Sequence, residues 1–100
     1  MTITPEQVQA TLAAHGIKCV IVDKGNPDTS EHAELSIESK RAVTVWVSPT
    51  DDTVYVAKWH PHRGDYSCSN VYHFDHRGIP TLVKIIQRAM DSNRPLDRVP

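Results

Sequence analysis

The chain has 100 residues, a formal net charge of −1, 39% hydrophobic residues and 23% charged residues. This length predicts one domain spanning residues 1–100 with a core of its own, and the composition argues against a disordered chain. The near-zero charge argues against a dedicated nucleic-acid-binding protein, which would be basic, and against a strongly acidic DNA mimic.

Charge is nevertheless distributed unevenly along the chain. Between residues 23 and 52, seven acidic residues accompany three basic ones, and from residue 76 onward five basic residues accompany two acidic ones. Such a polarity can orient a partner, although the solvated surface of a neutral protein often has it too.

The sequence also bears on location. No stretch is long and apolar enough to span a membrane, and the first twelve residues lack the basic start and apolar run of a secretory signal. We therefore expect a cytoplasmic protein with no membrane partner, in which Cys19 and Cys68 are reduced thiols.

The first predicted element is a helix over residues 5–15. Thr4 suits the N-cap, Pro5 suits the first helical position, and Gln7 stands where a capping box needs a glutamine. Gly16 is expected to end this helix, with Ile17 packing back onto it.

Strands are predicted next. Residues 17–24 are apolar on both sides, which predicts a central strand. Residues 32–38 alternate, with Ala33, Leu35 and Ile37 facing inward. Turns at 25–30, 39–41 and 49–52 separate these strands from two more, at 42–48 and 53–60.

The C-terminal third begins with a break over residues 61–65. A fifth strand is expected within residues 66–75, with Tyr66, Cys68, Tyr72 and Phe74 on one face. A second helix, opened by Gly78 and Pro80, follows. Its apolar stripe consists of Leu82, Ile85, Ile86, Ala89 and Met90. Residues 93–100 carry two prolines and predict an irregular tail.

The order of elements predicts an α+β fold. We expect a two-layer sandwich in which an antiparallel sheet of four or five strands is flanked by an N-terminal and a C-terminal helix. Both helices are expected on one face of the sheet, over seven aliphatic residues: Leu35, Ile37, Val43, Val45, Val47, Val54 and Val56. An open sheet edge would also permit a homodimer.

Potential metal ligands are concentrated between residues 59 and 76. The candidate ligands of a zinc site are His60, His62, Cys68, His73 and His76. Three histidines with an open position would also permit a small metal-dependent hydrolase. The spacing matches no standard zinc motif, and histidines are common at strand ends and in polar loops. A pH-sensitive patch is a third interpretation of the cluster.

No other chemistry is signalled. The chain has no glycine-rich phosphate loop, no nucleophile elbow and no nucleotide-cofactor motif. We therefore expect a non-catalytic protein that needs no cofactor, with zinc as the alternative.

The second face of the sheet is aromatic. If the valines face the helices, Trp46, Tyr55 and Trp59 share the opposite face, and Tyr72 and Phe74 can join them. An exposed aromatic patch indicates a partner surface, unless residues 61–72 and the tail fold over it.

Three functional hypotheses follow. The first is a binding protein acting through protein–protein contact, of the accessory or inhibitory kind found in phages and mobile elements, with Trp46, Tyr55 and Trp59 at the centre and His60, His62 and Arg63 at the rim. The second is the zinc protein or hydrolase. The third, with less support, is nucleic-acid binding through the aromatic face or the basic C-terminal helix. The helix–sheet–helix order also resembles that of double-stranded-RNA-binding domains, but the basic run expected at the start of their last helix is missing.

Overall fold

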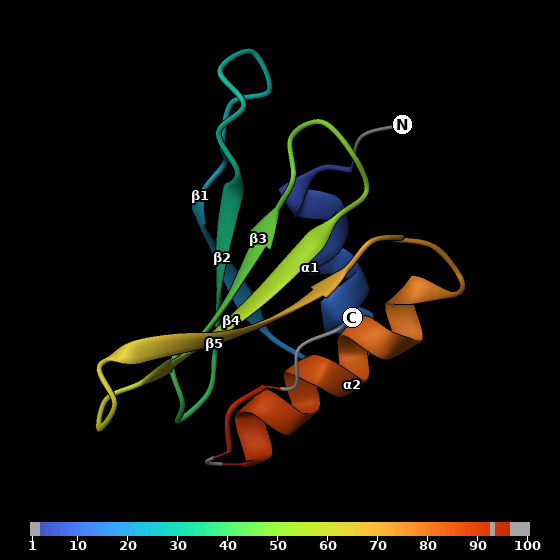
Figure 1. Cartoon of the computed structure of the whole chain (residues 1–100). Coiled ribbons are helices and arrows are strands. Elements are labelled where there is room, and N and C mark those ends of the chain that lie inside the picture. The colour runs from blue at the N-terminus through green and yellow to red at the C-terminus, as the bar shows by residue number, and fades with distance from the viewer. Residues whose placement is uncertain (1–2, 93, 97–100) are drawn as a thin grey trace.

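The computed structural model describes residues 3–92 and 94–96. The chain forms an α+β fold in which one helix precedes and one follows a single five-stranded antiparallel sheet (Figure 1). The elements are α1 (Pro5–Ala14), β1 (Cys19–Asp23), β2 (Ala33–Ile37), β3 (Val43–Val47), β4 (Val54–His60), β5 (Asp65–Val71) and α2 (Gly78–Asp91). The predicted fold class is confirmed.

Helix α1 begins as its sequence predicts. The Gln7 backbone N–H donates to Thr4 Oγ1 over 3.1 Å, and the Thr4 N–H donates to Gln7 Oε1 over 2.8 Å. Gly16, at a φ of 78°, reverses the chain after the helix. The Ile17 N–H then donates to the Leu12 carbonyl, and both side chains are buried in the core.

The five strands lie in the sheet in the order of the sequence, each paired with the next. In a meander of this kind the first strand lies at an edge, so the prediction of a central strand for residues 17–24 is wrong. Cys19 is buried, but Val20 and Val22 are 51% and 60% exposed. A bulge between Ile21 and Asp23 further distorts this edge.

Both helices pack against one face of the sheet, α1 mainly over β1 and β2 and α2 over β3, β4 and β5. All seven aliphatic residues predicted for this helix-side face are buried. From α2, Leu82, Ile86 and Ala89 are buried as predicted, and Val83 is buried in addition. Among the described residues, no helix is long and apolar enough to cross a membrane.

The strand predicted within residues 66–75 ends earlier, at Val71. Asp75 Oδ1 accepts the N–H groups of Arg77 and Gly78, over 2.9 and 3.1 Å, and so caps the start of α2. A Cβ at Gly78 would lie 1.5 Å from the His73 carbonyl oxygen, so only glycine fits there. This tight reversal turns Phe74 onto the core instead of onto the face of Tyr66 and Cys68.

The described part of the C-terminal tail runs on the helix side. Residues 94–96 are irregular, as predicted, and Leu96 packs against the core. The Leu96 N–H donates to Ser67 Oγ, and Lys58 Nζ donates to the carbonyls of Ser92 and Arg94. The rest of the predicted tail, residues 93 and 97–100, lies outside the described residues.

Candidate functional site: the open face of the sheet

The face opposite the helices, here called the open face, carries the aromatic residues. The strand residues on it include Val20, Glu34, Ser36, Thr44, Trp46, Tyr55, Ala57, Trp59, Tyr66, Cys68 and Asn70. Trp46 lies opposite Tyr55 across β3 and β4, and Trp59 lies opposite Tyr66 across β4 and β5. The prediction that Trp46, Tyr55 and Trp59 share a face is therefore confirmed as geometry.

The rings contact one another edge to face. The centroids of Trp59 and Tyr66 are 4.8 Å apart, those of Trp46 and Tyr66 are 6.3 Å apart, and those of His32 and Tyr55 are 5.4 Å apart. We call these five residues the aromatic cluster. Edge-to-face pairs at such distances are mutually attractive, so the cluster holds its shape without support from a helix.

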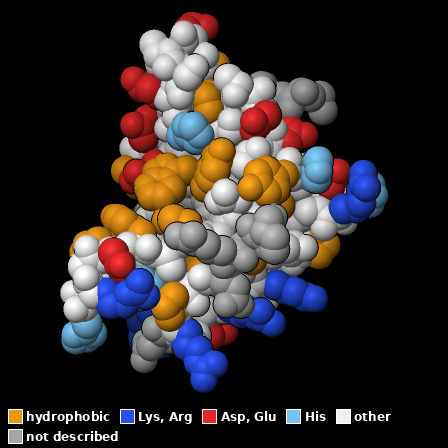
Figure 2. All heavy atoms as spheres, in the orientation of Figure 1, with side chains coloured by type: hydrophobic (Ala, Val, Ile, Leu, Met, Phe, Trp, Pro, Cys, Tyr) orange, Lys and Arg blue, Asp and Glu red, His pale blue; other side chains and the backbone are white. Residues whose placement is uncertain are grey.

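The cluster is accessible. Tyr66 is 54% exposed, and Trp46, Tyr55 and Trp59 are partly buried against one another. Hydrophobic side chains form a band across the molecule, with most acidic side chains towards one end and most basic ones towards the other (Figure 2). Residues 65–71 extend the open face as a strand, and described tail residues 94–96 lie on the helix side.

A shallow hollow opens within this face. It has a volume of about 380 Å³ and is lined by His32, Trp46, Tyr55, Cys68 and Asn70. The indole N–H of Trp46 donates to Glu34 Oε1 over 3.0 Å, which fixes the ring beside a carboxylate. His32, Asn70 and Tyr66 are not among the binding residues predicted from the sequence. Tyr66 could have been placed in the site from the sequence, because a turn at residues 61–64 pairs it with Trp59.

The three predicted rim residues, His60, His62 and Arg63, do not all lie beside the aromatic cluster. His62 and Arg63 lie exposed in the turn between β4 and β5, where Arg63 forms an ion pair with Asp65 over 3.0 Å. His60 lies on the helix-side face instead, because it shares the strand alternation of Val54, Val56 and Lys58. It is buried, and its Nε2 lies 2.7 Å from Ser67 Oγ.

The five predicted metal ligands are not brought together. His60 and His62 lie at one end of the β4–β5 hairpin, whereas His73 and His76 follow its other end. Strand β5 has seven residues, so the two ends lie about 20 Å apart. Cys68 lies on the open face, opposite in direction to His60. Within residues 3–92 and 94–96, no group of three or more His, Cys, Asp or Glu side chains could hold a metal ion.

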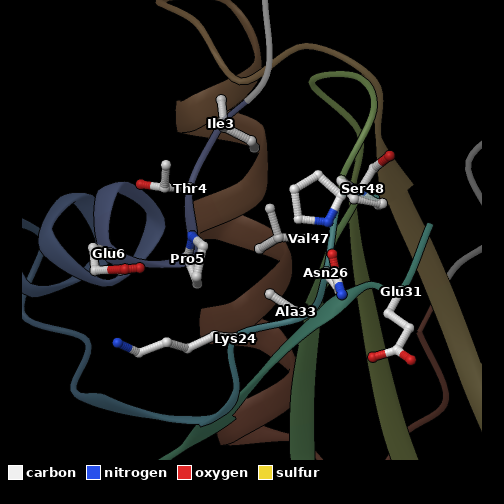
Figure 3. Close-up of a pocket in the computed structure, with 12 residues that line it drawn as sticks. Ile3, Thr4, Pro5, Glu6, Lys24, Asn26, Glu31, Ala33, Val47 and Ser48 are labelled. Carbon is white, nitrogen blue, oxygen red and sulfur yellow. The ribbon is translucent and has the colours of Figure 1, made fainter. Parts of the chain in front are cut away.

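A second hollow, of about 230 Å³, lies where the start of α1 meets the β1–β2 loop and the β3–β4 turn (Figure 3). Its lining is mixed, with Ile3, Ala33 and Val47 among the apolar residues and Glu6, Lys24 and Glu31 among the charged ones. In Figure 3 the Lys24 side chain extends towards the α1 side and Glu31 points the other way. This hollow was not predicted from the sequence.

The perturbed ionisable groups lie mainly off the open face. Burial, and then the charge of Arg41, lower the pKa of Lys58 on the helix side. Burial, and then Glu38, raise the pKa of the Cys19 thiol. The backbone N–H groups of Arg77 and Gly78 lower the pKa of Asp75. These shifts accompany the core and the start of a helix, so they do not mark a catalytic centre.

Comparison with known proteins assigns no relative to this arrangement: no family model, no curated protein and no solved structure matches the chain.

Proposed function

We propose that this protein is a non-catalytic binding protein whose open face contacts a protein partner. The observation that carries the proposal is the aromatic cluster, which is accessible on a sheet face away from both helices. Large accessible aromatic patches are enriched at protein interfaces, and tryptophan and tyrosine contribute most of the binding energy there.

The ring geometry suits such a role. Because Tyr66 contacts both Trp46 and Trp59, the rings are held in place before a partner arrives. Less side-chain freedom is then lost on binding, which favours affinity. His62 and Arg63, in the exposed turn beside Trp59, remain candidates for the rim of the interface.

Nucleic-acid binding is less well supported. None of the described strand residues on the open face is lysine or arginine, and Glu34 lies beside Trp46. A stacking surface for single-stranded nucleic acid needs basic residues along the backbone path. A zinc site or metal-dependent hydrolase is also less well supported, because the five candidate ligands lie apart.

The setting of this activity is part of the same proposal. We place it in the cytoplasm, as an accessory or inhibitory protein of the phage or mobile-element type. The support is that these 100 residues carry no cofactor or catalytic motif.

Site-specific photo-crosslinking tests the proposal. In a Cys68→Ser background, Ser36→Cys places a benzophenone label at the margin of the open face, and Gln87→Cys places it on the exposed side of α2. Buried Cys19 is protected from the label. In lysate of the expressing host, we expect one discrete adduct from position 36 and none of the same mass from position 87.

The tryptophans supply the second arm of this experiment. Trp46→Ala combined with Trp59→Ala should abolish the position-36 adduct, while circular dichroism and thermal unfolding show a folded chain. An adduct that forms equally from position 87, or that survives in the folded double variant, would contradict the proposal.

A further inference from the structure

Two acidic residues face each other across β1 and β2. Asp23 is the register partner of Glu34, at the bulge of the edge strand. Like charges placed directly opposite one another destabilise a sheet. Neither carboxylate forms an ion pair with a residue in the described ranges. The pair therefore leaves negative charge uncompensated at this side of the open face.

Each carboxylate keeps one oxygen available. Asp23 Oδ1 accepts the Gly25 N–H over 2.8 Å, and Glu34 Oε1 accepts the Trp46 indole N–H over 3.0 Å. Neither side chain makes a further hydrogen bond to a described residue. Lys24, the nearest lysine in sequence, extends towards the α1 side of the sheet (Figure 3). Within residues 3–92 and 94–96, no lysine or arginine side chain pairs with these oxygens.

The hollow lies beside Trp46, whose indole N–H donates to Glu34, and its walls attract a cation. Its lining includes the rings of Trp46 and Tyr55, and a guanidinium or ammonium group is attracted to the face of such rings. A guanidinium is planar, stacks on aromatic rings, and can donate hydrogen bonds to a carboxylate at the same time. An ammonium group can do only part of this.

We propose, resting on the proposed function, that the protein partner of the open face inserts an arginine side chain into the hollow between Trp46, Tyr55 and Asn70. There the guanidinium stacks against the rings and donates to the free oxygen of Glu34. The positive charge also balances the negative charges of Glu34 and Asp23, which are register partners. The partner therefore presents a positively charged side chain to the open face.

A peptide titration tests the charge requirement. The probes are acetyl-Gly-Gly-Arg-Gly-Gly-amide and the same peptide with citrulline, which keeps the planar shape without the charge. In two-dimensional ¹H–¹⁵N spectra of the intact chain, the arginine peptide should shift the Trp46 indole signal. It should bind at least about fivefold more tightly than the citrulline peptide, and more weakly at high salt.

Matched carboxylate variants locate the contact. Glu34→Gln should lower the ratio of the affinities for the arginine and citrulline peptides by at least about fivefold. Glu6→Gln, which removes an equal charge from α1, should leave this ratio unchanged. Equal binding of the two peptides, shifts that avoid Trp46, or no binding of the arginine peptide would overturn the inference.

The two proposals fail separately. If crosslinking from position 36 succeeds while the peptides show no charge preference, the partner uses apolar contacts alone and only the arginine inference falls. If the arginine preference is present but the position-36 adduct is absent or insensitive to the tryptophans, the hollow is a cation site and the open face is not the protein interface.

Discussion

The two faces of the five-stranded sheet come from the same strands, yet they differ in what their side chains contact. On the helix side, aliphatic residues meet α1 and α2 and are almost completely buried. On the open face, aromatic residues contact one another and stay partly exposed. We therefore expect the helix side to contribute most of the stability and the open face to tolerate substitution better. Matched substitutions on the two faces should therefore differ in their effects.

The largest expected effect on stability comes from valine-to-alanine changes. Val45, on the helix side of β3, is fully buried, whereas Val20, on the open side of β1, is 51% exposed. Val45→Ala should lower the free energy of unfolding by about 2–3 kcal/mol through lost burial and a cavity. Val20→Ala should cost less than about 1 kcal/mol. Urea unfolding measures both, and equal losses would contradict the distinction between the faces.

The next effect concerns the buried lysine of the helix side. Lys58 has a lowered pKa in the folded state because burial and Arg41 disfavour its charge. The folded chain then binds fewer protons than the unfolded chain as the pH approaches the ordinary lysine value of 10.5. The free energy of unfolding of the wild type, relative to Lys58→Met, should therefore rise with pH in this window.

Urea unfolding at a series of alkaline pH values gives this difference. Lys40→Met, in an exposed turn, is the control and should run parallel to the wild type. If the free energy of unfolding of Lys58→Met also ran parallel to that of the wild type across this pH range, the folded environment would not disfavour the charge of Lys58.

A smaller effect is expected at the start of α2. Asp75 has a lowered pKa because its carboxylate accepts the N–H groups of Arg77 and Gly78. A depressed carboxylate pKa contributes stability that is present above the ordinary value of 3.8 and is lost as the pH falls through the folded value.

Acid titration of thermal unfolding tests this contribution. The advantage of the wild type over Asp75→Asn should be constant at neutral pH and should disappear at the acidic end. An advantage that persists at the lowest pH would indicate a structural effect of the amide and would contradict the ionic cap.

The smallest effect leaves the fold unchanged and reports on the two faces directly. Cys19 is buried on the helix side with a raised thiol pKa, and Cys68 is exposed on the open face. Iodoacetamide should alkylate Cys68 at least about tenfold faster than Cys19 in the folded chain, because the reagent needs an accessible thiolate. Mass spectrometry of peptide fragments gives both rates. Similar rates in native buffer, but not in urea, would contradict the assignment of the two cysteines.

Local patterns predicted much of the architecture. Capping residues located α1, and strict alternation located β2, β3 and β4 along with the seven buried aliphatic residues. The same alternation places His60 with Val54 and Val56, so its burial was within reach of the sequence.

Other features depended on which segments lie next to one another in the fold, and local sequence patterns do not show this. The exposure of Val20 and Val22 depended on which strand lies at the edge of the sheet, and a two-sided apolar strand fits either position. The predicted alternation of side chains along the fifth strand fails after Val71. The capping by Asp75 and the close approach of Gly78 to His73 turn the chain away from the sheet there.

In the candidate site, too, some features followed from the sequence and others needed the tertiary structure. Alternation along single strands was enough to gather Trp46, Tyr55 and Trp59 on one face. The contact of Tyr66 with both tryptophans, the hollow, and the opposition of Asp23 and Glu34 required the register between strands. Proximity in sequence suggested one metal site for five histidine and cysteine residues, but the β4–β5 hairpin carries its two ends about 20 Å apart.

The sequence by itself determined which segments form helices and strands and which side of each central strand is apolar, because these depend on the periodicity of neighbouring residues. The tertiary structure decided which strand is at the edge, which side chains meet across strands, and which face stays open. These properties arise from pairing between segments distant in the sequence, and single-residue shifts in register would change all of them.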